Sequence, residues 1–436
     1  MRERLCLSLV IVAYLIFSLL YNVATPYRQV GYLKHQRGAD GGPLVVQDIG
    51  APDELQHANY VATLQAGKGV PVLKPGAPDL YETYQSHQPP LYYFIASAWA
   101  TLWSMDPTTV HDGPYLRGLN SIIGAISLLL LFVAVKVGTG DRLTALAATA
   151  ICGLMPMWVA LHAAVSNDPL LFCFGTAFLA AMASVLRSGW NPSRAILIGV
   201  ILGLGLWTKT TALAFVLVSL VGAVLRWGES KQAWLRWLPV AIALVIIAPW
   251  WIRNTQVYGD PLAMGAFKAA FVGSAQRANL VAMLGGGFGA EWTYWTQWFG
   301  WWTIRSFFGV FGQMDLFYDP IFYALALTGA LACVAGWATS WRTVEAGCER
   351  TFRWLCVTCC IVVAILFLQF NLTYFQAQAR YLYPAMGAIS AGLAMGYVHW
   401  TKRSFAAWVV LFIALLAANW ATVQFLTNEF AVRTGR

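Results

Sequence analysis

Two adjacent acids open a polar stretch that could do chemistry. In "APDELQHANYV", residues 51–61, Asp53 and Glu54 follow a proline, and His57 comes about one helical turn later. A carboxylate there could accept a proton as a general base or contribute to an oxygen-rich divalent-cation site. It could also simply begin a helix, where the helix dipole favours an acid. The residue types alone leave these roles open.

The elements that must position these residues are those of a membrane protein. Of the 436 residues, 59% are hydrophobic and only 11% are charged, against about 25% charged in soluble domains. Many apolar runs approach the ~20 residues of a spanning helix, and the short alternating segments of a β-barrel are missing. We therefore predict an all-α polytopic membrane protein, with residues 1–436 as a single domain. The net charge of +9 then indicates basic cytoplasmic loops rather than nucleic-acid binding.

Basic residues decide the predicted topology. The apolar runs predict eleven spans, at residues 5–22, 118–138, 143–163, 169–187, 195–207, 210–226, 237–252, 320–340, 354–372, 384–400 and 406–424. The segment 89–105 is also apolar, but as a span it would put nearly all the Lys and Arg clusters of the later loops outside, against the positive-inside rule. We therefore expect it to lie at the surface, with the N-terminus in the cytoplasm and the C-terminus outside.

This topology places two long segments on the outer side. The first extracytoplasmic loop, 23–117, contains the adjacent acids and is predicted to carry two interfacial helices, near 53–66 and 89–105. The second loop, 253–319, contains "EWTYWTQWFGWWTIRSFF". Because tryptophan and tyrosine favour the headgroup level, that stretch is expected to anchor the loop in the membrane.

Several motifs follow one another in a defined order. They are "DELQHANY", "YQSHQPPLYYF" about thirty residues later, "RGLNSIIGAIS", "AAVSNDPLL", "LGLGLWTKTTAL", "PWWIRNTQVYGDPL", "RSFFGVFG" and "RYLYP". Together they resemble the GT-C glycosyltransferases that use polyprenyl-phosphate sugars, among them the protein O-mannosyltransferases and the lipid A aminoarabinose transferase. The later motifs are most similar to a less characterised bacterial branch. The resemblance covers nearly the whole chain.

The resemblance implies an inverting transfer of a sugar from a polyprenyl-phosphate donor to a lipid, glycan or protein acceptor. The site would face outward from a bacterial inner membrane. It would use Asp53 as the base that accepts the proton of the attacking hydroxyl, with Glu54 and His57 orienting the acceptor or the base. The resemblance implies no required metal, so no cofactor is predicted, although these three side chains and Asp168 could together bind a divalent cation.

The remaining candidates are a second acid and a set of cations. Asp168 is either another acid of the cavity or a helix N-cap before Pro169. Cations are needed because negative charge grows on the departing phosphate in the transition state. The candidates are Arg117, Lys209, Arg253 and Arg380, which is followed by Tyr381. Each could instead be a cation that snorkels to the membrane surface.

One position departs from the resemblance. Relatives often have a lysine directly before the Pro-Pro pair, whereas this chain has His87-Gln88 there. Either His87 makes a weaker, pH-sensitive contact with the phosphate, or other cations hold it.

A rival function from another class is a flippase or transporter for polyprenyl-linked sugars. Transporters tend to show internal repeats, and charges at mid-membrane on broken helices. This sequence shows no repeat, and its ionisable residues gather at one predicted face. That pattern favours the transferase.

Overall fold

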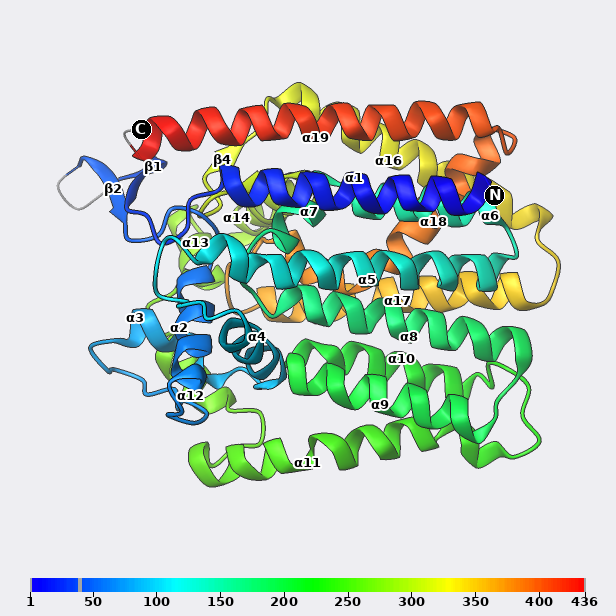
Figure 1. Ribbon diagram of the computed structural model, residues 1–436, viewed down its shortest axis with the longest axis horizontal. Helices are drawn as coiled ribbons and strands as arrows, with labels where there is room; N and C mark the ends of the chain where they lie inside the picture. Colours follow the sequence, from blue (N-terminus) through cyan, green and yellow to red (C-terminus); the bar gives the residue numbers. More distant parts are fainter. Residues whose placement is uncertain (1, 38–40, 435–436) are drawn as a thin grey trace.

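The computed structural model describes residues 2–37 and 41–434, which form a bundle of long helices with nearly common axes (Figure 1). The helices of the bundle are α1 (Arg2–Ala24), α5 (Gly113–Thr139), α6 (Arg142–Gly153), α7 (Pro156–His162), α8 (Asp168–Ser188), α9 (Pro192–Thr208), α10 (Leu213–Val224), α11 (Leu238–Tyr258), α16 (Pro320–Ser340), α17 (Cys348–Asn371), α18 (Met386–Trp400) and α19 (Phe405–Thr434). The predicted all-α polytopic membrane fold is confirmed.

The predicted count of eleven membrane spans is not confirmed. Each of the eleven predicted segments falls on one of these helices, with α6 and α7 together forming one of them. Within the described residues, however, only seven helices are long and apolar enough to span a membrane, or eight if α6 and α7, bent by 63°, form one broken span. The other three predicted segments fall on shorter helices, because α9, α10 and α18 have 17, 12 and 15 residues.

Short elements gather at one end of the bundle, which we call the loop end (Figure 1). The helices are α2 (Glu54–Gln65), α3 (Leu80–Thr83), η1 (Tyr84–His87), α4 (Leu91–Leu102), α12 (Met264–Ala270), α13 (Arg277–Met283), α14 (Gly287–Thr293), η4 (Tyr294–Gly300), α15 (Trp301–Phe308) and η6 (Ala379–Ala385). The strands form two antiparallel pairs, β1 (Gly31–Arg37) with β2 (Pro43–Val46), and β3 (Val310–Phe311) with β4 (Leu316–Phe317).

The two helices predicted in the first loop are present. Helix α2 begins after Pro52, and α4 begins directly after Pro89-Pro90, where proline suits the first turn. At about 1.5 Å per residue, α4 is roughly 18 Å long, well short of the ~30 Å hydrocarbon core. Its length therefore agrees with a segment that does not cross the bilayer.

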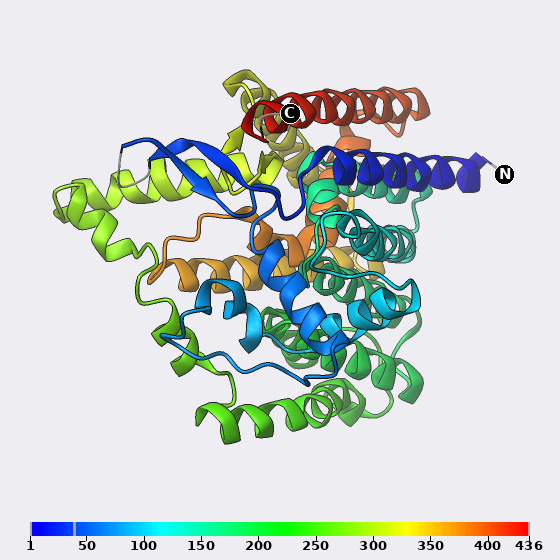
Figure 2. The ribbon, with the colours of Figure 1, turned by 60° about the vertical axis from the view of Figure 1, so that its left-hand side comes forward.

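The opposite end of the bundle, which we call the turn end, holds the start of α1 and the connections between long helices (Figure 1). Two of these connections contain the short helices η3 (Ala233–Arg236) and η5 (Trp341–Thr343), whereas η2 (Thr210–Ala212) lies at the loop end. Helices α1 and α19 run side by side along one edge of the bundle, as Figures 1 and 2 both show. The chain therefore begins at the turn end and reaches Thr434 at the loop end.

Glycines allow the closest helix contacts. A Cβ on Gly396 of α18 would lie 1.8 Å from the carbonyl oxygen of Cys333 in α16, and one on Gly124 of α5 would lie 1.9 Å from the Tyr14 hydroxyl oxygen of α1. Small residues commonly let membrane helices approach in this way. These contacts fix the bundle that carries the loop end.

Thiol labelling should distinguish the two ends. We expect cysteines introduced at Lys68 and Gly285, both exposed at the loop end, to react with an impermeant reagent from outside, and one at Lys231 to be protected. Ser86 is unsuitable because its side chain is buried, with 4% exposure. The test requires a background in which the eight native cysteines are replaced. Labelling of Lys231 alone would reverse the predicted orientation.

Candidate active site

Asp53 lies at the start of α2 but does not cap it. Its backbone is left-handed, with φ of 64°, and its side chain makes no capping hydrogen bond. The carboxylate instead accepts a hydrogen bond from Arg380 Nη2 of η6 at 2.5 Å and another from the Tyr84 hydroxyl of η1. With 22% of its side chain exposed, Asp53 remains accessible. The structure therefore contradicts the simple cap and gives the acid a place in a charged site.

The electrostatic environment keeps Asp53 ionised. Burial alone would raise its pKa, but the Arg380 charge and the Tyr84 hydrogen bond outweigh that effect and lower the pKa to about 2. The same carboxylate raises the pKa of Arg380 against the opposing effect of burial. Asp53 is therefore a carboxylate at neutral pH. Its affinity for a proton stays low as long as Arg380 remains bound to it.

Asp168 and Lys209 form a second ion pair. Asn167 is the N-cap of α8 and Asp168 is its first helical residue, so the predicted cap lies one residue earlier. The Asp168 carboxylate contacts Lys209 Nζ at 2.5 Å, with the two side chains only 5% and 13% exposed. Lys209 lies in the extended break between α9 and η2, and its Nζ is 5.9 Å from the ring centre of Tyr381.

His57 is close enough to both ion pairs to be affected by their charges. Its Nδ1 is 2.8 Å from the Tyr93 hydroxyl of α4, and its ring is buried. Burial lowers its pKa to about 3, partly countered by Asp53, so the imidazole is neutral. The charges that act on it come from both ion pairs, which are Asp53 with Arg380 and Asp168 with Lys209. The structure therefore brings these predicted residues together in one site.

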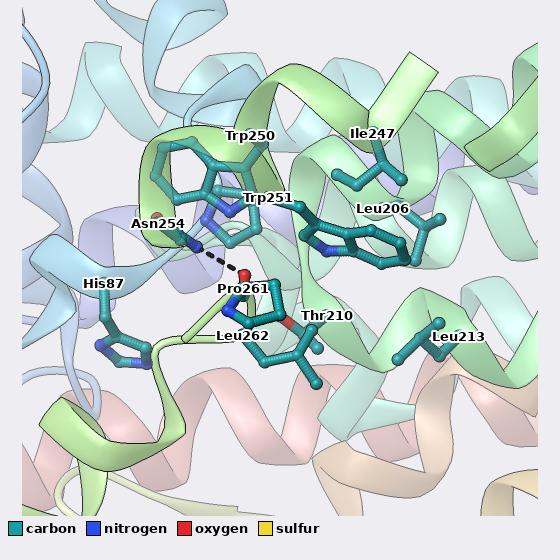
Figure 3. A pocket seen from close by; sticks show the side chains of 11 residues that line it. His87, Leu206, Thr210, Leu213, Ile247, Trp250, Trp251, Asn254, Pro261 and Leu262 are labelled. Atoms are coloured by element: carbon teal, nitrogen blue, oxygen red, sulfur yellow. Dashed lines mark hydrogen bonds between the residues drawn. The ribbon is translucent and has the colours of Figure 1, made fainter. Parts of the chain in front are cut away.

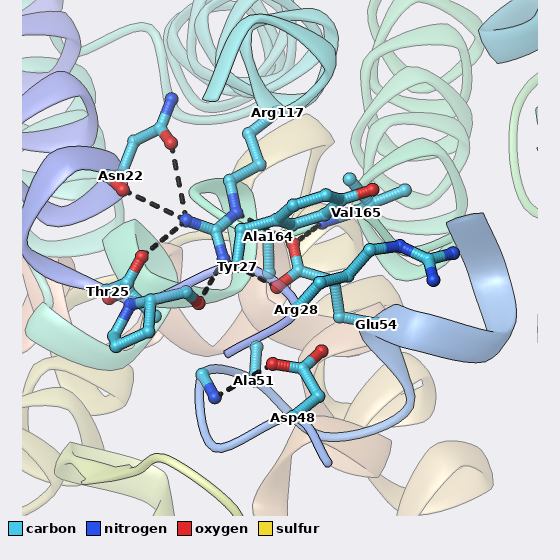
Figure 4. Close-up of polar contacts among 12 residues, drawn as sticks. Asn22, Thr25, Tyr27, Arg28, Asp48, Ala51, Glu54, Arg117, Ala164 and Val165 are labelled. Atoms are coloured by element: carbon cyan, nitrogen blue, oxygen red, sulfur yellow. Dashed lines mark hydrogen bonds and ion pairs between the residues drawn. The ribbon is translucent and has the colours of Figure 1, made fainter. Parts of the chain in front are cut away.

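Glu54 and Arg117 form a buried ion pair with each other, apart from the Asp53 site (Figure 4). The guanidinium donates to both Glu54 oxygens, at 2.7 and 2.5 Å, and both side chains are 0% exposed. Arg117 also donates to the carbonyls of Asn22, Thr25 and Pro26, and Glu54 accepts from the Val165 amide at 2.7 Å. Neither side chain has an exposed atom to offer a substrate.

His87 lines a narrow pocket with Trp250 and Asn254 (Figure 3). The pocket volume is about 10 Å³, which is room for roughly one water molecule. The imidazole Nδ1 donates to the Tyr84 carbonyl at 2.7 Å, and burial lowers the pKa of His87 to about 4. His87 is therefore neutral at pH 7 and cannot supply the positive charge of the lysine found in relatives.

Arg253 lies beside this pocket, next in sequence to Asn254. Its guanidinium donates to the Pro71 carbonyl at 2.9 Å and stacks on Trp250, 4.8 Å from the ring centre. Within residues 2–37 and 41–434, it forms no ion pair with a carboxylate. Arg253 is thus a partly exposed cation whose charge is not neutralised by an acid.

A second cavity adjoins Asp53. Its volume is about 50 Å³, and it is lined by Pro52 and Arg380 together with mainly apolar side chains of α7 and of residues 310–314. The site therefore borders a narrow pocket at His87 and a mainly apolar cavity at Pro52.

Two contributors were missed by the sequence reasoning. Tyr84 donates to Asp53, and Tyr93 contacts His57. Both occur in the quoted motif "YQSHQPPLYYF", but no periodicity singles them out from its other aromatic residues. Only the folding of η1 and α4 against α2 shows their roles.

Within the described part of the chain, no group of three or more His, Cys, Asp or Glu side chains lies close enough to hold a metal ion. The four-residue cation site considered from the sequence does not assemble, because Glu54 turns to Arg117 while Asp168 turns to Lys209.

Comparisons with known proteins agree with this architecture. Residues 87–252 match the family model described as dolichyl-phosphate-mannose-protein mannosyltransferase. No curated protein gives a significant match. Among solved structures, the oligosaccharyltransferase AglB of Archaeoglobus fulgidus, in complex with an inhibitory peptide and a dolichol-phosphate, superposes with a TM-score of 0.58 over 97% of this chain, at 13% identity. ArnT of Cupriavidus metallidurans in the apo state gives 0.53 over 93%, at 16% identity.

These similarities establish the fold. The chain is an integral membrane protein with the GT-C fold, which it shares with these two proteins. It spans 55% of the length of the AglB chain and 62% of the ArnT chain.

Proposed function

We propose that this protein is an inverting glycosyltransferase that moves a sugar from a polyprenyl-phosphate donor to a hydroxyl of a lipid, glycan or protein acceptor. The observation that carries the proposal is the placement of Asp53, an ionised and accessible carboxylate, against Arg380 and beside the Asp168–Lys209 pair. A base adjoining phosphate-binding cations is what this transfer requires.

The charge balance supports Arg253 as the residue that contacts the donor phosphate. The pairs Asp53–Arg380 and Asp168–Lys209 are each neutral overall, and His57 and His87 are uncharged at pH 7. Arg253 adds a positive charge without an acid partner in the described chain. A glycosyl phosphodiester carries a single negative charge, so Arg253 is its primary contact, and Lys209 and Arg380 would share the charge that develops on departure.

Donor binding would also activate the base. An approaching phosphate competes with Asp53 for Arg380, and each weakened contact raises the pKa of Asp53 from about 2 toward the range useful for proton transfer. The acceptor oxygen then attacks the anomeric carbon as the bond to the phosphate oxygen breaks. The acceptor proton passes to Asp53, and polyprenyl phosphate leaves with the bonding electrons. Attack opposite the leaving group inverts the anomeric configuration.

The other predicted residues take supporting parts in this proposal. Tyr381, whose ring faces Lys209, would border the sugar-phosphate. His57 is a neutral hydrogen-bonding group that orients the acceptor or Asp53. Glu54 and Arg117, fully buried against each other, would hold the start of α2 in place rather than bind substrate.

The proposed location is a bacterial inner membrane with the loop end facing outward. Support comes from the cations of the turn end, because the positive-inside rule places basic short loops in the cytoplasm. Lys136, Arg142, Arg187, Lys231 and Lys402 all lie near that end.

The activity itself is tested by product analysis. The purified protein would be incubated with a panel of polyprenyl-phosphate sugars and membrane-derived acceptors, and the anomeric configuration of any new glycoside determined by NMR. Inversion is expected. A product that retains the donor configuration would exclude the single-displacement mechanism.

Replacing Arg253 should chiefly weaken donor binding. Losing a charged hydrogen bond costs about 1.5–3 kcal/mol, roughly a 10- to 100-fold rise in the donor KM for Arg253→Ala. Lys268→Ala, which removes an exposed loop-end cation, is the matched control and should leave KM unchanged. If Arg253→Ala keeps the wild-type donor KM, Arg253 does not contact the donor and serves only as an anchor at the membrane interface.

A further inference from the structure

A large polar cavity lies at the turn end, far along the bundle from Asp53. Its volume is about 420 Å³, within the ~300–1,000 Å³ typical of small-molecule sites. Its walls are the turns that join α5 to α6, α16 to α17, and α18 to α19. Because these turns come from distant parts of the sequence, the cavity is a product of the assembled bundle.

Some charges in this cavity are already neutralised. Arg353 bonds to Glu349 and to the Ser340 hydroxyl, at 2.8 and 2.6 Å. Asp141 caps α6, accepting from the amides of Leu143 and Thr144. These groups build the wall of the cavity and have little capacity left for a ligand.

Three other charges are free. Lys402, Arg403 and Glu345 line the cavity and are exposed. Across residues 2–37 and 41–434, none of their side chains has a hydrogen-bonding or ion-pair partner. The uncommitted charge is therefore two positive against one negative, which favours a ligand carrying a single negative charge.

The backbone that presents the two cations is unusual. Lys402 and Arg403 are consecutive residues with φ of 51° and 59°. This left-handed region is disfavoured for residues other than glycine, asparagine and aspartate. The turn therefore holds two long basic side chains at the cavity in a place where glycine would be the easier choice.

Aromatic side chains favour a position of the cavity at the level of lipid headgroups. Trp354 and Trp400 follow the lining residues Arg353 and His399 in sequence and are 50% and 55% exposed, and the Trp341 ring centre lies 5.8 Å from the Arg353 guanidinium carbon. Tryptophan concentrates at the membrane interface. Met395 and Val398 add an apolar part to the lining, which suits the start of an acyl chain more than a free anion.

We propose that this cavity binds the phosphodiester headgroup of an anionic membrane phospholipid, with Lys402 and Arg403 holding the phosphate. A basic pocket between membrane helices, at the face where anionic lipids are attracted, fits this chemistry. The site is separate from the Asp53 site and does not depend on the proposed transferase activity.

Lipid retention in nanodiscs tests the proposal. The protein would be placed in phosphatidylcholine nanodiscs containing increasing phosphatidylglycerol, and the retained lipid measured by native mass spectrometry. Lys402→Gln/Arg403→Gln should reduce phosphatidylglycerol retention about tenfold or more. The matched control is Arg226→Gln/Lys231→Gln, which removes two exposed cations from another turn and likewise includes a left-handed residue, Arg226 with φ of 56°. This control should retain the lipid as the wild type does.

A variant with the opposite expected effect on lipid retention leaves the Lys402–Arg403 turn unchanged, so its result does not depend on whether that turn folds correctly. Glu345→Gln removes the free acid and should strengthen phosphatidylglycerol retention. If the double variant and its control lose phosphatidylglycerol equally, the retention depends only on the general surface charge and the proposal is overturned. The stabilisation of the protein by inorganic phosphate would also be measured in pure phosphatidylcholine nanodiscs. If it equals the stabilisation by phosphatidylglycerol, the ligand is a soluble anion and the proposal is overturned.

Discussion

Asp53→Asn should lower turnover by about 10²- to 10⁴-fold, the usual contribution of a general base. Asparagine keeps the shape of the side chain and can still accept from the Tyr84 hydroxyl, but it cannot take the acceptor's proton. The charged bond to Arg380 weakens as well, so a stability loss of about 1.5–3 kcal/mol is expected without unfolding. Initial rates at saturating donor and acceptor provide the measurement.

Two controls separate basicity from charge and from hydrogen bonding. Asp168→Asn removes an acid from the neighbouring ion pair and leaves Lys209 unpaired, but it spares the base. Tyr84→Phe removes a hydrogen bond to Asp53 and leaves its carboxylate. Both should retain far more turnover than Asp53→Asn. Equal losses in Asp53→Asn and Asp168→Asn would assign Asp53 to electrostatic support of the site rather than to proton transfer.

Breaking the Glu54–Arg117 pair should instead damage folding. Removing one partner of a buried ion pair typically costs about 3–5 kcal/mol, because the other charge is left uncompensated. Glu54→Gln or Arg117→Met should therefore lower the thermal unfolding midpoint sharply in detergent. The sequence predicts that Glu54 orients the acceptor or the base, and in that role Glu54→Gln would do less harm than Asp53→Asn. The full burial of both side chains is the reason for the revised expectation.

The double variant Glu54→Gln/Arg117→Met provides the control. It removes both charges together, so much of the lost stability should return, as replacement of whole buried pairs by neutral groups often allows. If Glu54→Gln alone is as stable as the wild type but binds acceptor poorly, Glu54 contacts substrate and the positioning role is wrong.

The neighbouring acids show what sequence could and could not predict. Asp53 and Glu54 were both recognised as important, and the start of α2 was predicted correctly. Asp53 has a left-handed backbone just before α2, whereas Glu54 is the first helical residue, and the two carboxylates turn to different partners, Arg380 and Arg117. The choice between partners depends on residues 327 and 63 positions away, which no local pattern encodes.

The fold was easier to predict than the site. Apolar periodicity located the helices, and the two prolines before Leu91 marked the beginning of α4. The apolar runs at 195–207 and 210–226 were already short in the sequence, as are α9 and α10, but nothing in the sequence reasoning anticipated the β1–β2 hairpin. The substitution of His87 was noticed, but its neutral state follows from burial, a property of the assembled loop end.

The measurement that tests the account most directly uses sealed proteoliposomes with a radiolabelled polyprenyl-phosphate sugar and a hydroxyl-bearing acceptor on the loop-end side. We predict that label passes to the acceptor as a new glycoside, that free polyprenyl phosphate appears in equal amount, and that Asp53→Asn abolishes most of both. Movement of the intact labelled donor across the membrane, with no glycoside formed by the wild-type protein, would contradict the account and identify a transporter.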